Sequence, residues 1–116
     1  MPLPSERDSL LYLEDMLRFC ERVIAYSRGL DLPALRADAM RYDAVLRNLE
    51  LIGEAATHVP DAIRAAHSDI PWRLIVATRN RLIHGYLGID DDTVWSIVSS
   101  DVPLVQARLK QLLAAP

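Results

Sequence analysis

The sequence predicts an all-α protein, a bundle of four to five helices. Apolar residues recur at steps of three and four along every long segment, as one face of a helix requires. Only four glycines and seven prolines occur, most of them near segment edges, so long stretches rich in Leu, Ala, Arg and Glu remain uninterrupted. The 116 residues, 51% of them hydrophobic, can build one core, and we expect residues 1–116 to form a single domain.

The charge balance excludes a basic arm for nucleic-acid binding. The net charge is −3, and the longest block of one sign is the run Asp90–Asp92. Any contact with RNA or DNA must therefore be local. Cys20 is the single cysteine and cannot form an internal disulfide. With neither a signal-peptide pattern nor an apolar run of membrane length, we expect a cytoplasmic protein that does not contact a membrane.

The first predicted helix runs from Ser5 to Arg28. Ser5 precedes an acidic first turn, which is typical of a helix start. Gly29 is placed to cap the end, and residues 31–33 form either a connector or the first turn of the next helix. The apolar face of this helix consists of Leu10, Leu13, Leu17, Cys20 and Ile24.

The second predicted helix lies between Tyr42 and Val59 and is central, because two adjacent apolar stripes give it a broad apolar face. Gly53 on that face permits the close approach of a neighbouring helix. Pro60 and Asp61 end this helix and begin a short helical turn through residue 67. Ser68 or Asp69 then caps a further helix that has Pro71 in its first turn.

The last two predicted helices are separated by glycines. One ends at Gly85 and Gly88 and carries the stripe Trp72, Ile75, Arg79, Leu82 and Tyr86. The other begins with an N-cap region at residues 90–93 and keeps its apolar rhythm across Pro103. That continuity favours one kinked helix, although Asp101 could also cap a separate start.

Arg79 is the unusual member of its stripe, since an arginine on an apolar face costs several kcal/mol unless it is paired or faces water. It can form an ion pair with Glu54, and it can also line a cleft. His84 follows five residues later, about 7.5 Å along the helix axis, where the helix ends and the imidazole can turn toward Arg79. Asn80 lies four residues before His84, within reach of an imidazole nitrogen. Tyr86 adds a phenol at the same helix end.

Together these groups indicate a site for a phosphodiester, because a guanidinium binds phosphate oxygens and a histidine transfers a proton. Simpler roles stand beside this one. His84 can be a capping residue at the helix C-terminus, and Trp72 and Trp95 are core or interface residues rather than platforms for bases. Arg73 and Arg81 lie on a solvated face, where they can supply local positive potential.

No metal site or cofactor is expected from the sequence. His58 and His67 are expected to be surface residues without cysteine or carboxylate partners at ligand spacing. The run Asp90–Asp92 is interpreted as a helix N-cap rather than as a metal site.

The run of residues 79–90 resembles the signature of HepT-like proteins of the HEPN superfamily. Arg79 and His84 are separated by four residues, and Tyr86 follows two residues after His84. Residues 47–55 are similar to a helical block of that family, and Val94-Trp95 with residues 101–103 is similar to its last helix. The resemblance covers about residues 8 to 113.

The resemblance implies an all-helical HEPN-type fold, a homodimer, and a role as the toxin of a type VII HepT/MNT toxin-antitoxin system. The implied activity is metal-independent cleavage of RNA, in which Arg79 stabilises the phosphorane, His84 acts as general base or acid, and Asn80 orients. The implied partner is a minimal nucleotidyltransferase (MNT) antitoxin that transfers AMP from ATP to Tyr86. The alternative is a helical module that binds the nucleotidyltransferase, or serves as its substrate, without cutting RNA.

Overall fold

Helices account for all the regular structure in residues 6–84 and 89–114, the residues that this computed structural model describes. No strand occurs in these ranges, which confirms the predicted all-α class. In chain order the elements are α1 (Glu6–Ser27), α2 (Leu32–Ala37), α3 (Ala39–Thr57), α4 (Asp61–Ala66), α5 (Trp72–Ile83), α6 (Asp91–Ser96), the π-helical turn η1 (Ile97–Asp101) and α7 (Val102–Ala114).

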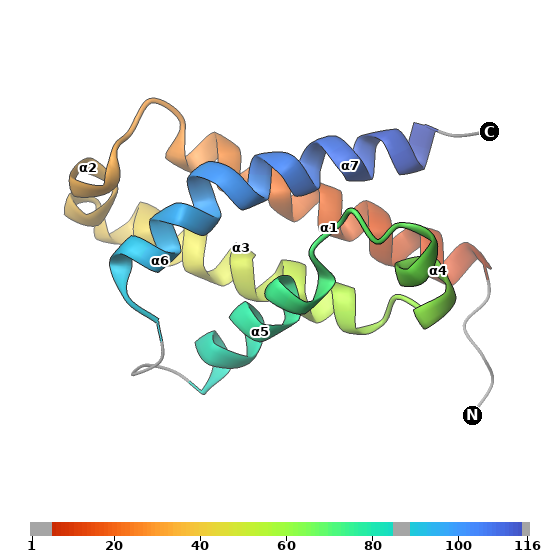
Figure 1. Cartoon of the computed structure of the whole chain (residues 1–116). Helices are drawn as coiled ribbons and strands as arrows, with labels where there is room; N and C mark the ends of the chain where they lie inside the picture. The colour runs from red at the N-terminus through yellow and green to blue at the C-terminus, as the bar shows by residue number, and fades with distance from the viewer. Residues whose placement is uncertain (1–5, 85–88, 115–116) are drawn as a thin grey trace.

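Helix α3 lies at the centre of the bundle, as predicted. It packs against α1 on one side and α5 on another, while α7 packs along α1 (Figure 1). The short helices α2 and α4 lie at opposite ends of the bundle, and the first turn of α1 and the last turn of α7 lie at the α4 end. Helix α5, which carries the candidate site, is therefore held mainly through its contact with α3.

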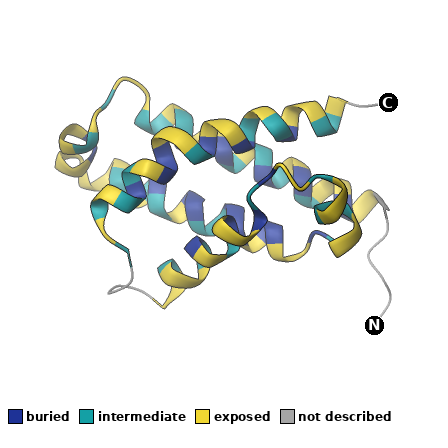
Figure 2. Cartoon of the chain, viewed as in Figure 1, coloured by how far each residue is buried: buried dark blue, intermediate teal, exposed yellow. Residues whose placement is uncertain are grey.

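The core is formed by the inward faces of the long helices, which are the dark faces in Figure 2. Each large apolar side chain removed from water contributes about 1.5–3 kcal/mol to stability. Cys20 belongs to this core, is 0% exposed, and burial raises the pKa of its thiol to about 12. The largest fully buried side chains are Leu13, Met16, Leu35, Ile70, Leu109, Val23, Val45, Val94 and Cys20.

Several helix ends follow the local chemistry of the sequence. Gly29 has a φ of +76°, a conformation that costs little without a Cβ, and it lies just after α1. Residues 31–33, which the sequence predicts to be either a connector or the first turn of the next helix, begin α2. Asp31 caps this helix by accepting a hydrogen bond from the Ala34 N–H at 2.9 Å. Asp90 caps α6 by accepting from the Thr93 N–H at 2.7 Å, as predicted. Ser5 lies outside the described residues.

The predicted start of α5 is wrong. Neither Ser68 nor Asp69 caps this helix; Pro71 is the N-cap residue, ahead of the first turn rather than within it, and no side chain caps the helix. The reason is the burial of Ile70, which is 2% exposed and lies in a turn whose main-chain groups are already bonded. The Trp72 N–H donates to the Ile70 carbonyl at 2.8 Å, so the helix can begin only after Pro71.

The predicted continuity across Pro103 is confirmed. Helices α6 and α7 join without a break through η1, in which the Val102 N–H donates to the Ile97 carbonyl. The wider π-helical turn ends two residues before Pro103, which has no N–H to donate to a regular helix. Asp101 lies within η1 and does not begin a new helix.

Candidate active site

Arg79 lies where α5 comes closest to α3, directly over Gly53. A Cβ added to Gly53 would lie 2.2 Å from the Arg79 Cβ and 2.9 Å from the Ile75 carbonyl oxygen. Because real Cβ atoms do not approach other atoms so closely, no other residue fits here without moving α5. The predicted close approach at Gly53 is confirmed, and the aliphatic part of Arg79 fills the space.

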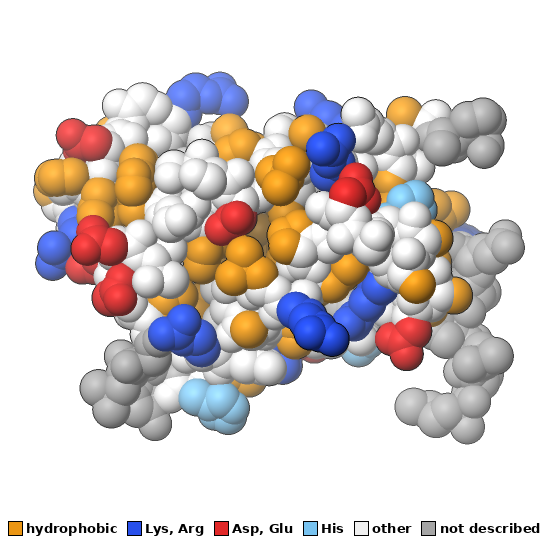
Figure 3. All heavy atoms as spheres, in the orientation of Figure 1, with side chains coloured by type: hydrophobic (Ala, Val, Ile, Leu, Met, Phe, Trp, Pro, Cys, Tyr) orange, Lys and Arg blue, Asp and Glu red, His pale blue; other side chains and the backbone are white. Residues whose placement is uncertain are grey.

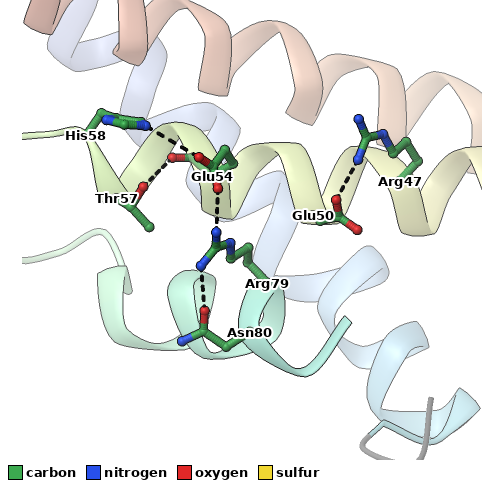
Figure 4. Close-up of polar contacts among 7 residues, drawn as sticks. All are labelled: Arg47, Glu50, Glu54, Thr57, His58, Arg79 and Asn80. Carbon is green, nitrogen blue, oxygen red and sulfur yellow. Dashed lines mark hydrogen bonds and ion pairs between the residues drawn. The ribbon is translucent and has the colours of Figure 1, made fainter. Parts of the chain in front are cut away.

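The guanidinium of Arg79 is held from two sides (Figure 4). Its Nη2 lies 2.7 Å from the Glu54 Oε2, and its Nη1 donates to the Asn80 Oδ1 at 2.8 Å. The Arg79 side chain is 26% exposed and that of Glu54 is 47% exposed. An ion pair this open to water adds at most about 1 kcal/mol, so its main effect is to orient the guanidinium. The pairing of Arg79 with Glu54 agrees with one of the two interpretations made from the sequence.

Asn80 does not take the position expected for it. Its amide oxygen accepts from Arg79 instead of bonding the His84 imidazole, and the hydrogen bond described between Asn80 and His84 joins main-chain atoms at 3.3 Å. The reason is that the Arg79 guanidinium, paired with Glu54, lies between α3 and α5, within reach of the Asn80 side chain (Figure 4). Asn80 therefore orients Arg79 in this structure.

His84 is the C-cap residue of α5 and its side chain is exposed. Its main-chain N–H donates to the carbonyls of Asn80 and Arg81, which ends the helix. Gly85 and Tyr86 lie outside the described residues. The expected turn of His84 toward Arg79 and the position of the Tyr86 phenol therefore stay predictions.

A second histidine joins the network, which the sequence reasoning missed. His58 Nε2 lies 3.4 Å from Glu54 Oε1, on the other side of the carboxylate from Arg79. The Tyr12 ring of α1 stacks on the His58 ring at a centroid distance of 4.7 Å. The spacing of Glu54 and His58, four residues on one helix, is a signal that could have found this pair. His58 is exposed, as expected, but the expectation that it has no carboxylate partner is wrong, because Glu54 lies one helical turn before it. His58 belongs to a network that runs from α5 through α3 to α1.

The segment that carries the candidate site has only positive formal charges. Residues 70–89 contain no Asp or Glu, whereas they include Arg73, Arg79 and Arg81. Arg73 and Arg81 are exposed, in agreement with their expected place on a solvated face. The pKa of Asp90 is lowered, first by the hydrogen bond from Thr93 and further by the nearby Arg81.

Two other features of the described residues bear on function. No three His, Cys, Asp or Glu side chains within residues 6–84 and 89–114 are gathered as a metal ion would require. Over the same ranges, no helix has the length and apolar character needed to cross a membrane.

Comparison with known proteins assigns this arrangement of helices and residues to a family. Residues 16–112 match the model of a family described as Ribonuclease HepT-like. A protein of Thermococcus cleftensis named as a probable ribonuclease HepT is 34% identical over 101 residues, which are 87% of this chain and 92% of the relative.

Two further relatives are named as candidate RNases. One, from Caldanaerobacter subterraneus subsp. tengcongensis, is 33% identical over 88% of this chain and 91% of its own length. The other, from Methanocaldococcus jannaschii, is 36% identical over 91% of this chain and 97% of its own length. No solved structure matches the chain.

Proposed function

Since this chain belongs to the HepT-like ribonuclease family, we propose that it is a metal-independent endoribonuclease that cleaves RNA with Arg79 and His84. We further propose that it is the toxin of a type VII HepT/MNT pair and is silenced by AMP transfer to Tyr86. The observation that supports the site is the fixed guanidinium of Arg79, held over Gly53 by Glu54 and Asn80 on the same helix as the exposed His84.

The proposed reaction starts at the ribose next to the scissile phosphate. The 2′-oxygen forms a bond to phosphorus while the bond from phosphorus to the 5′-oxygen breaks, which leaves a 2′,3′-cyclic phosphate and a 5′-hydroxyl. His84 takes the proton from the 2′-hydroxyl or gives one to the leaving 5′-oxygen. Arg79 stabilises the charge that builds on the equatorial oxygens, a task for which a pre-oriented guanidinium is suited.

The first experiment separates His84 from a histidine in a similar structural position. The wild type is expected to cleave RNA in EDTA, and His84→Ala is expected to lose that cleavage while it keeps its helical circular-dichroism spectrum. His67→Ala is the matched control, because His67 is the C-cap residue of α4 as His84 is of α5. Cleavage that survives in His84→Ala, or that disappears equally in His67→Ala, would contradict the proposed role.

In the proposed silencing reaction, the Tyr86 phenol oxygen attacks the α-phosphorus of ATP and pyrophosphate leaves. The acid-free segment of residues 70–89 supports this step, because positive potential attracts the triphosphate and favours a phenolate. The product is a bulky anionic phosphodiester close in sequence to His84. It would compete with RNA for Arg79 and repel the RNA backbone, so the modified protein stays folded but inactive.

The test of silencing is to incubate the protein with its cognate nucleotidyltransferase, ATP and magnesium, and to map the adduct by peptide mass spectrometry. AMP is expected on Tyr86. Tyr42, whose hydroxyl donates to Asp91, and Tyr12, which stacks on His58, serve as internal controls. Modification of either one, with Tyr86 unmodified, would refute the assignment, and full silencing of Tyr86→Phe would mean that the partner inhibits by binding alone.

The alternative function, a partner module that does not cut RNA, is favoured by one observation. Both Nη atoms of Arg79 are already bonded to Glu54 and Asn80, and its Nε is buried without a hydrogen-bond partner. A phosphate must therefore displace or share these contacts. A wild-type protein that binds the nucleotidyltransferase tightly but cleaves no RNA would establish the alternative.

A further inference from the structure

The three arginines of α5 have different surroundings. Arg79 points toward α3 and pairs with Glu54, whereas Arg73 and Arg81 are exposed. The net charge of the chain is −3 and residues 70–89 carry +3, so the remaining residues together carry −6. A polyanion is therefore attracted more strongly to the outer side of α5 than to the remaining residues taken together.

Arg73 and His84 lie on the same side of α5. They are 11 residues apart in the sequence, which is close to three helical turns and about 16 Å along the axis. Asn80, which is also exposed, falls on the same side between them. Figure 3 shows arginine or lysine side chains and a histidine along the edge of the molecule formed by α5, at the bottom of that view.

A surface hollow lies at the far end of this row, where α4 meets α5. Arg64 and Arg73 stand at its sides, and Ile70, Pro71 and Leu74 add apolar walls. This lining of arginines and apolar side chains suits a nucleotide, which needs cationic groups for its phosphate and apolar surface for its base.

The Arg64 guanidinium is held in place by main-chain carbonyls and an aromatic ring rather than by a carboxylate. Its Nη2 donates to the Ala56 carbonyl at 2.6 Å, its Nε donates to the Val59 carbonyl at 3.1 Å, and the guanidinium lies 5.9 Å from the centre of the Trp72 ring. Neither Arg64 nor Arg73 forms an ion pair with a carboxylate in the part of the chain that the structure describes. Arg73 and the Nη1 of Arg64 remain able to bind an anion.

We propose that the RNA strand lies along the outer side of α5, with the scissile phosphate at the His84 end and a distal nucleotide in the hollow between Arg64 and Arg73. This proposal rests on the proposed ribonuclease activity and adds a substrate path to it. The distance of about 16 Å spans about five stacked nucleotides at ~3.4 Å each, and fewer if the strand is extended. Cleavage should therefore depend on RNA several nucleotides away from the bond that is cut.

The test uses 2′-O-methyl oligonucleotides that contain one ribose, so that the 2′-hydroxyl can attack at one position only. The flank on each side of this ribose is lengthened from one to eight nucleotides. For the wild type, kcat/KM is expected to rise about tenfold as one flank passes about three to five nucleotides, and then to level off. For Arg73→Gln this rise of kcat/KM with flank length should be absent.

Salt dependence gives a second readout, which a general loss of structure would not produce. Losing one phosphate contact lowers the slope of log affinity against log salt by about 0.7 for a single strand. Arg73→Gln should show this reduction. The matched control is Arg22→Gln, which removes an exposed arginine from α1 and should leave slope and length dependence as in the wild type. Arg64→Gln should act like Arg73→Gln, and its melting temperature is recorded because Arg64 also bonds the end of α3.

Each outcome separates this proposal from the proposed function. If Arg73→Gln matches Arg22→Gln in both readouts while the wild type cleaves RNA, the path along α5 is wrong and the ribonuclease activity stands. If Arg73→Gln leaves RNA cleavage intact but weakens binding of the nucleotidyltransferase, the surface binds protein and the RNA path is wrong. If the wild type cleaves none of the oligonucleotides and no natural RNA, the proposed function itself fails.

Discussion

Gly53 and Glu54 position Arg79 by opposite means, one by lacking a side chain and the other by supplying a carboxylate. The two residues are adjacent on α3, so the place of the guanidinium depends on α3 as much as on its own helix. This explains how an arginine can belong to the apolar stripe of α5. Its stem packs in the helix contact and its head reaches the partly exposed edge.

Gly53→Ala tests this arrangement. The added Cβ would lie 2.2 Å from the Arg79 Cβ, so the two helices must separate. We expect the free energy of unfolding to fall by about 1–3 kcal/mol and RNA cleavage to fall with it. Gly29→Ala is the control: it has open space and a φ of +76°, so it should cost about 1–2 kcal/mol without changing kcat/KM. A Gly53→Ala protein with wild-type stability and activity would show that the close contact is unimportant.

Arg79→Ala and His84→Ala should differ in stability although both abolish cleavage. Arg79→Ala removes a stem packed on Gly53 and the ion pair with Glu54, so we expect a loss of about 1–2 kcal/mol. His84→Ala changes an exposed capping residue and should cost under about 1 kcal/mol. Chemical denaturation measures both. Large and equal losses would mean that both residues mainly hold the fold, and that lost cleavage says nothing about mechanism.

The sequence could predict which residues share the candidate site better than it could predict their contacts. The Arg79 pairing with Glu54 was predictable because an arginine on an apolar stripe needs a partner and α3 offered one. The contact between Asn80 and Arg79 was not predictable, since it depends on where Glu54 draws the guanidinium. The stacking of Tyr12 on His58 depends on how α1 packs on α3, which periodicity within one helix does not report.

At the scale of elements, a polar cluster ties α6 to α2 and α3. Asp91 accepts a hydrogen bond from the Tyr42 hydroxyl at 2.5 Å and pairs with the Arg36 Nε at 2.9 Å. The cluster anchors the start of α6, just after the segment of residues 85–89 that follows the candidate site.

This cluster should make stability fall at alkaline pH. Burial and the bond to Asp91 raise the pKa of Tyr42 from 10.0 to about 12. Between these values the unfolded chain loses the phenol proton while the folded chain keeps it, so the free energy of unfolding decreases as pH rises. Burial raises the Cys20 pKa from 9.0 to about 12 and acts in the same direction.

Tyr42→Phe isolates the contribution of the phenol. At pH 7 it should cost about 1 kcal/mol for the lost hydrogen bond, and this difference from the wild type should shrink as pH rises from about 10 to 12. Urea denaturation at several pH values measures this difference in the free energy of unfolding. Tyr26→Phe is the control variant. A difference that stays constant across this range would contradict the raised pKa of Tyr42.

The helices themselves were predictable to a greater degree than their ends. Stripes of apolar residues report burial directly, which is why the long helices and the continuity across Pro103 were found. The start of α5 was not, because Ser68 and Asp69 satisfy local capping rules while the burial of Ile70 decides the turn. The widening of the helix at η1 leaves no clear pattern in the sequence.

At the scale of the whole molecule, the predicted homodimer has a candidate surface. Helix α5 and the segment from η1 to α7 face each other across a small apolar cavity, lined among others by Ile75, Ile97 and Val105. Leu104, near the start of α7, is 41% exposed. Trp72 does not contribute, since it is 7% exposed and belongs to the core.

We expect a two-fold dimer that covers this apolar surface, measured by light scattering at micromolar concentration. Leu104→Glu should shift the mass to that of a monomer while the circular-dichroism spectrum stays helical. Met40→Glu, at a residue that is 85% exposed on α3, is the control and should leave the mass unchanged. A wild type that remains monomeric would exclude the dimer.

The separation of charge along this small molecule has a consequence for how it meets other molecules. With +3 on residues 70–89 and −6 elsewhere, the protein has an electric dipole moment that points toward its α5 edge. In the field of a nucleic acid such a dipole turns the protein before contact, so collisions occur with α5 in front more often than random tumbling allows. This orientation acts over roughly 8 Å at physiological ionic strength. Association would then be fast at low salt even though protein and RNA are both negatively charged overall.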